Sequence, residues 1–258
     1  MTTTSTTCAN CGAIPAGDYC QGCGQRQGLE RFTLASLLHE IPHAIFHVDR
    51  GLPATLRQLA RRPGEAIRGY LDGQRTKYFN PLTLLVLMAG LSAFLYSAYP
   101  FNYTFATAAP AEKWGALAEK YGEFARQNFR FYSLTLVIYL PAMALISWAS
   151  FAGLGAARAR TYGEHLIINA FFLAFMSFLM VVCFPVLALT NATPAFAPIW
   201  FAFTLTLLGY QFAVYYAVFA GAGHRVTTAL RAALATLVYL AMVTIVPLAF
   251  FFFVFLKL

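Results

Sequence analysis

The chain has 258 residues, of which 59% are hydrophobic and only 11% are charged, and its formal net charge is +8. Soluble globular domains carry charge on about a quarter of their residues, so this composition excludes an ordinary water-soluble fold and places the chain among membrane proteins. In a membrane protein, an excess of Lys and Arg is explained by their placement in the cytoplasmic loops. We therefore expect no nucleic-acid partner.

The first predicted element is a zinc ribbon at residues 1–28, built from two Cys-x2-Cys pairs. Cys8 and Cys11 form the first pair, Cys20 and Cys23 form the second, and eight residues separate them. A glycine follows each pair and allows the tight turn that aims both sulfurs at one point. Four thiolates would complete the site of one structural Zn²⁺, with no open position for catalysis. Two disulfides are the alternative, which a reducing cytoplasm disfavours.

Residues 29–81 form a predicted cytoplasmic segment between the ribbon and the membrane. Two short amphipathic helices are expected here, one beginning near Pro53 and one after the break at Pro63 and Gly64. Their basic residues suit the anionic surface of the cytoplasmic leaflet. The same helices would also serve to cap the bundle from inside, and the sequence leaves both interpretations open.

The same segment contains a match to the metalloprotease motif H-E-x-x-H at His39, Glu40 and His43. A zinc protease needs both histidines one turn apart on a continuous helix, with the glutamate as general base. Pro42 breaks that helix, so we assign no catalytic residues and keep a zinc-dependent membrane protease as the third hypothesis. His47 continues the four-residue spacing, and metal binding by the three histidines is left open.

Five apolar stretches without Asp, Glu, Lys, Arg or His follow in the predicted transmembrane domain, residues 82–258. Each has about 18 residues or more, enough to cross a hydrocarbon core about 30 Å thick. Backbone groups must be satisfied within each segment there, so the predicted fold class is all-α, a polytopic membrane helix bundle with a small N-terminal zinc ribbon. The predicted spans are 82–99, 131–154, 166–190, 199–220 and 232–256.

The distribution of basic residues predicts the orientation of these spans. Thirteen of the 18 Lys and Arg residues precede the first span or fall in the loops after the second and fourth spans. By the positive-inside rule, this side faces the cytoplasm. We therefore expect a multi-pass protein of the bacterial inner membrane, with a cytoplasmic N-terminus and a periplasmic C-terminus.

Candidate binding residues gather at the predicted cytoplasmic edge of the bundle. A carboxylate, imidazoles and cations at one depth could hold a lipid headgroup or a phosphate, and an ion-paired rim would use the same residues. Inside the spans, polar side chains such as Asn169 and Gln211 are explained by hydrogen bonds between helices. The candidate headgroup-binding residues are Arg75, Lys77, Glu164, His165, His224 and Arg225.

Three motifs resemble a family of uncharacterised bacterial membrane proteins, defined by a domain of unknown function. They are the four-cysteine ribbon, an R-G-Y-x-x-G-x-R element from Arg68 to Arg75, and a Y-x-E-H-L element from Tyr162 to Leu166. The resemblance implies a membrane fold of five helices and no established activity.

The expected function is that of a non-enzymatic scaffold or regulatory module, which binds a protein partner in the cytoplasm or membrane through its zinc ribbon. The alternative is a lipid-handling or small-molecule transport protein with a headgroup site at the cytoplasmic edge. Membrane lipid is a predicted partner in either case, and a homo-oligomer is left open.

Overall fold

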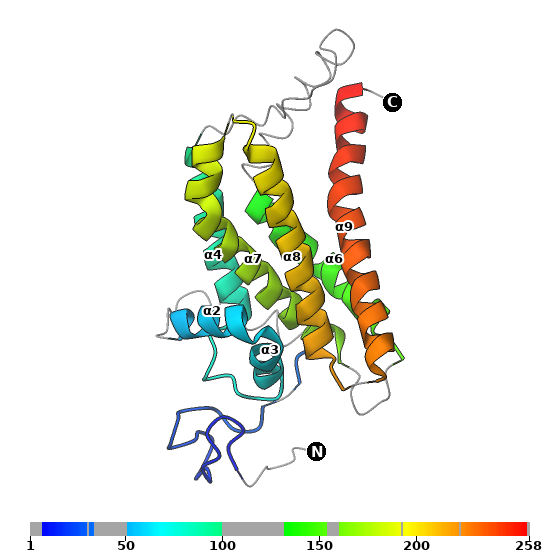
Figure 1. The fold of residues 1–258 in the computed structure, drawn as a ribbon. Coiled ribbons are helices and arrows are strands. Elements are labelled where there is room, and N and C mark those ends of the chain that lie inside the picture. The colour runs from blue at the N-terminus through cyan, green and yellow to red at the C-terminus, as the bar shows by residue number, and fades with distance from the viewer. Residues whose placement is uncertain are drawn as a thin grey trace.

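The computed structural model describes residues 7–29, 31–33, 51–99, 132–153, 160–191, 193–221 and 223–256. Within these ranges the structure has seven helices, and every regular element is one of them. Figure 1 shows the long helices side by side, the short helices across one end of them, and the N-terminal ribbon beyond the short helices. The all-α class expected from the sequence is therefore confirmed.

The two short helices are α2 (Leu52–Arg61) and α3 (Pro63–Leu71), and each carries a proline in its first turn. Proline suits this position because its fixed φ is helical and its missing N–H would have no helical partner. They cap the bundle: α3 approaches α8 so closely at Gly64 that a Cβ there would overlap the Cβ of Ala217. The Arg68 guanidinium donates to the Ala217 carbonyl at the same contact.

Four described helices are long and apolar enough to cross a membrane, by length and composition. Helix α6 has a shorter apolar portion, Val137–Ser150, among the residues that the structure describes. The first residues of α9 extend the helix before the predicted span at 232–256. The long helices are α4 (Pro81–Ala98), α6 (Tyr132–Ser150), α7 (Tyr162–Thr190), α8 (Phe196–Val218) and α9 (Arg225–Leu256).

Helix α7 is the core of the bundle. Every residue from Gly163 to Ser177 is buried, and α7 contacts α2, α3, α4, α6 and α8. The other long helices expose large apolar side chains, among them Phe94, Phe201 and Leu237. An apolar exterior around a packed central helix is what a bilayer requires, because lipid replaces water as the solvent of these faces. The N-terminal half of α7 lies against the short helices, where the Phe171 ring contacts Tyr70 of α3.

Candidate functional site

The four ribbon cysteines converge on one point. Their sulfur atoms all lie within 4.8 Å of one another, with 3.7 Å between Cys8 and Cys23 and 3.5 Å between Cys11 and Cys20. A tetrahedral site with metal–sulfur bonds of about 2.3 Å places its sulfurs about 3.8 Å apart. The four cysteines could therefore hold a metal ion, as the sequence predicts.

Two matching turns create this geometry. The Gly12 amide donates to the Cys8 carbonyl at 2.8 Å, and the Gly24 amide donates to the Cys20 carbonyl at 2.7 Å. Both glycines have positive φ, +76° and +71°, which side-chain-bearing residues rarely adopt. The two turns thus present their cysteine pairs in the same way, and the glycine after each pair serves the role expected from the sequence.

Backbone amides in these turns favour the metal-binding form of two thiols. Hydrogen bonding from the Cys11 backbone lowers the pKa of Cys8 to about 6. Hydrogen bonding from the Gln25 backbone likewise lowers the pKa of Cys23. The Cys11 thiol shifts the other way: backbone hydrogen bonding from Ala13 opposes the change, but the neighbouring Cys20 and Cys23 thiols raise the pKa of Cys11 to about 12. Since the thiolate is the form that binds metal, a bound cation would have to displace the Cys11 proton.

The ribbon is docked on the turn between α3 and α4. Gln25 is only 4% exposed, and its side-chain oxygen accepts from the backbone amides of Arg75 at 3.1 Å and Thr76 at 3.2 Å. In the same turn, a Cβ on Gly73 would lie 3.1 Å from the Cβ of Ala9. One side of the ribbon therefore rests on the bundle cap. No local feature of the sequence marks Gln25 for this contact.

Phe32, in the linker after the ribbon, anchors the chain to the bundle. Its buried ring stacks on Tyr70, with 5.6 Å between ring centroids, and the Arg75 guanidinium carbon lies 3.8 Å from the Phe32 centroid. Its carbonyl accepts from the Thr161 hydroxyl at 2.7 Å. A Cβ on Gly163 would lie 2.5 Å from the same carbonyl oxygen, so the approach of the linker to α7 requires glycine there.

Glu164, at the start of α7, is 1% exposed and has several partners. It accepts from Arg31 through both carboxylate oxygens and from the Thr161 backbone amide at 2.7 Å. Arg160 lies 3.6 Å away and also bonds Asp72 at 2.9 Å. A buried carboxylate needs such partners to remain charged. Neither arginine was predicted as a partner of Glu164: Arg160 stands four residues before it in the sequence, but Arg31 is 133 residues away and no local pattern marks it.

The other predicted edge residues have different surroundings. His165 is buried inside the bundle, with its Nδ1 2.9 Å from the Ser147 hydroxyl. Lys77, His224 and Arg225 are exposed, and in the described part of the chain none of them forms an ion pair or hydrogen bond with Glu164 or His165.

The linker at residues 31–33 therefore joins Arg75 to Glu164, and the contacts of Glu164 are those of an ion-paired rim. The headgroup role of the six edge residues stays a prediction. The H-E-x-x-H residues and His47 lie outside the described residues, so the protease hypothesis is likewise untested.

Comparison with known families finds one similarity. Residues 49–93 match a family described as a protein of unknown function (DUF3667). This stretch contains α2, α3, the turn on which the ribbon rests, and the first part of α4. It includes the R-G-Y-x-x-G-x-R element, whereas the ribbon and the Y-x-E-H-L element lie outside it. No curated protein and no solved structure matches the chain.

Proposed function

We propose that this protein is a membrane-embedded scaffold or regulatory module, whose metal-bound ribbon presents a fixed surface to a protein partner. The observation that supports this most is the two-sidedness of the ribbon. Gln25 and Ala9 are docked on the bundle cap, whereas Ile14 is 82% exposed and Tyr19 is 61% exposed. Both exposed side chains belong to the loop between the two cysteine pairs.

An exposed aliphatic and an exposed aromatic residue are suited to a protein interface, where such side chains supply much of the binding energy. The docked side fixes how they are presented. Because the metal supplies most of the folding free energy of so small a ribbon, metal loss should unfold the exposed loop and break the docking contacts. Partner binding would then depend on metal occupancy, which is the regulatory part of the proposal.

In this proposal the metal is Zn²⁺, since four thiolates in tetrahedral arrangement favour it over harder cations. The ribbon is cytoplasmic, and the bundle crosses the bacterial inner membrane five times, with α6 as one of the spans. The excess of Lys and Arg around the ribbon side supports this orientation.

Site-specific photo-crosslinking in the native membrane tests the proposal. A photoreactive amino acid at Ile14 or at Tyr19 should give the same discrete protein adduct, and the Cys20→Ser, Cys23→Ser double variant should lose it. Val226, an exposed apolar residue in the first turn of α9, is the control position. No adduct at the two ribbon positions, or an equal adduct at Val226, would contradict partner binding by the ribbon.

A further inference from the structure

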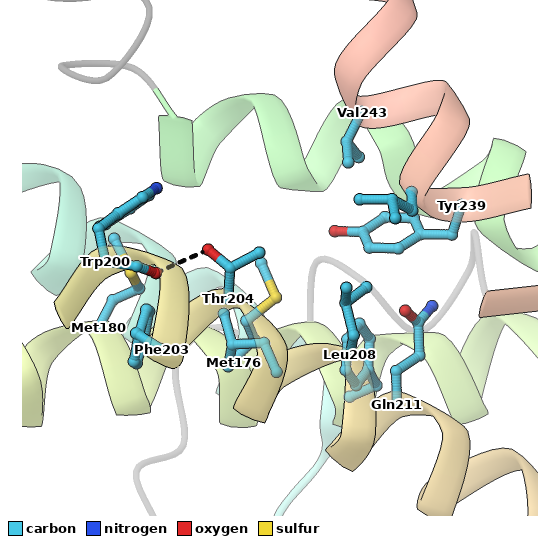
Figure 2. A pocket seen from close by; sticks show the side chains of 12 residues that line it. Met176, Met180, Trp200, Phe203, Thr204, Leu208, Gln211, Tyr239 and Val243 are labelled. Carbon is cyan, nitrogen blue, oxygen red and sulfur yellow. Dashed lines mark hydrogen bonds between the residues drawn. The ribbon is translucent and has the colours of Figure 1, made fainter. Parts of the chain in front are cut away.

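A cavity of about 60 Å³ lies between α7, α8 and α9. Its walls are mostly apolar, including Phe172 and Met176 of α7 and Val243 of α9. Figure 2 shows Gln211 of α8 beside this space, with its amide directed toward Tyr239 of α9. The wall residues Leu208, Leu240 and Val243 are only half-buried, so the cavity reaches the lipid-facing surface.

A chain of buried hydrogen bonds fixes the orientation of the Gln211 amide. Asn169 donates through its amide nitrogen to the His165 carbonyl at 2.8 Å, so its side-chain oxygen faces Tyr215. That oxygen can only accept, so the Tyr215 hydroxyl must donate its single proton to it, at 2.7 Å. The Tyr215 oxygen is then left to accept from the amide nitrogen of Gln211, at 3.4 Å.

The network therefore leaves the Gln211 oxygen as an acceptor without a donor. Gln211 is 0% exposed, and its Oε1 atom has no hydrogen-bond partner among the described residues. An unsatisfied buried acceptor is costly, and the hydrocarbon region offers no bulk water to satisfy it. An acceptor that is kept in this state, beside a cavity, is suited to a ligand that brings the missing donor.

We propose that this cavity binds a lipophilic alcohol or phenol from the bilayer, with its hydroxyl donating to Gln211 and its apolar chain lying along α8. The wall extends along α8 from Gln211 to Trp200, a rise of about 16 Å at 1.5 Å per residue. This length suits an extended hydrocarbon chain with a single polar group at one end, most of which would lie in the opening toward the bilayer rather than inside the 60 Å³ cavity. The other polar wall residue of α8, Thr204, donates its hydroxyl to the Trp200 carbonyl.

Trp200 lies at the opposite end of the cavity wall from Gln211, so its fluorescence can report a bound probe. The probes are bromodecanol, with bromine and hydroxyl at opposite chain ends, and bromodecane, which lacks the hydroxyl. The protein is the full chain in phosphatidylcholine nanodiscs, with Trp114→Phe and Trp148→Phe so that only Trp200 of its three tryptophans remains. Bromine at the far end of a bound probe would quench Trp200 fluorescence.

We expect bromodecanol to quench Trp200 at a concentration about three- to tenfold lower in the Gln211 protein than in Gln211→Leu, as one hydrogen bond allows. Bromodecane should quench both proteins equally, which corrects for probe partitioning into the bilayer. Val243→Phe, which fills the cavity, should lower quenching by both probes to the level that partitioning into the bilayer gives. Leu205→Phe, on the lipid-exposed face of α8, is the matched control and should change neither.

Two results would overturn the proposal. Equal bromodecanol quenching in the Gln211 and Gln211→Leu proteins would show that the amide oxygen receives no hydrogen bond from the probe. No quenching by either probe above that of Val243→Phe would show that the cavity holds only water or stays empty. Unchanged thermal unfolding of Gln211→Leu, or a small rise in Tm, excludes misfolding as the cause of lost binding.

Discussion

Gly163 and Gly209 are two helical glycines with opposite surroundings. A Cβ on Gly163 would meet the Phe32 carbonyl oxygen at 2.5 Å, whereas a Cβ on Gly209 of α8 would meet nothing within 4 Å. Glycine lowers helix stability relative to alanine, by about 1 kcal/mol. At Gly163 that loss is offset by the close approach of the linker, so the same substitution should have opposite effects at the two positions.

We therefore predict that Gly163→Ala lowers the stability of the purified protein by about 1–3 kcal/mol, because the linker must move away from α7. Gly209→Ala should leave the stability unchanged or raise it by up to about 1 kcal/mol. Thermal unfolding of both variants in the same detergent checks this. A Gly163→Ala variant as stable as Gly209→Ala would mean that the linker is not held against α7.

Among the elements, α7 connects the ribbon linker to the bundle core. In its first turn, the Glu164 carboxylate accepts hydrogen bonds from Arg31. At its N-cap, the Thr161 hydroxyl donates to the Phe32 carbonyl. Arg31 is more than half exposed, so its ion pair with the buried carboxylate is partly screened by solvent. Glu164 retains Arg160 and the Thr161 amide when Arg31 is removed.

A double-mutant cycle measures this contact. Arg31→Gln and Glu164→Gln should each destabilise the protein, and the double variant should cost less than the sum of the two by about 1 kcal/mol. The reason is that Arg31 interacts directly with the Glu164 carboxylate. Denaturation of the four proteins in detergent gives the cycle, with Arg57→Gln, an exposed residue of α2, in place of Arg31→Gln as the control. Strict additivity for Arg31 and Glu164 would show that they do not interact.

The elements were easier to predict than their contacts. Apolar runs long enough for a bilayer identified the long helices, and Cys-x2-Cys-Gly identified the converging sulfurs, because both signals are local. Hydrogen bonding between the polar residues of different spans was also expected, and Asn169 and Tyr215 show it. The roles of Gln25 and Arg31 could not be predicted, since their partners are 50 and 133 residues away and nothing local marks them.

The edge residues show the same limit. Glu164 and His165 are adjacent in sequence, and common depth suggested one shared site. The first turn of α7 instead directs Glu164 to the ribbon linker and His165 to Ser147 inside the bundle. Depth in the membrane can be inferred from a sequence, but the direction of each side chain depends on helix rotation and on the neighbouring helices.

At the scale of the whole molecule, the ribbon is docked on the bundle through direct contacts rather than attached only by the linker. The docking passes through backbone amides of the turn at residues 72–76, which matches the DUF3667 family within residues 49–93. If the metal folds the ribbon, its removal should release Gln25 from that turn while α7, buried in the bundle, keeps its structure.

Hydrogen exchange with and without metal tests this most directly. The purified full chain should contain about one zinc ion, and a strong chelator should remove it. We predict that chelation increases exchange both in the ribbon and in peptides containing the Arg75 and Thr76 amides, while peptides from residues 163–177 stay protected. Added zinc should restore the original pattern. Faster exchange confined to the ribbon, with the 72–76 turn unchanged, would contradict docking, and a metal-free protein would contradict the metal centre itself.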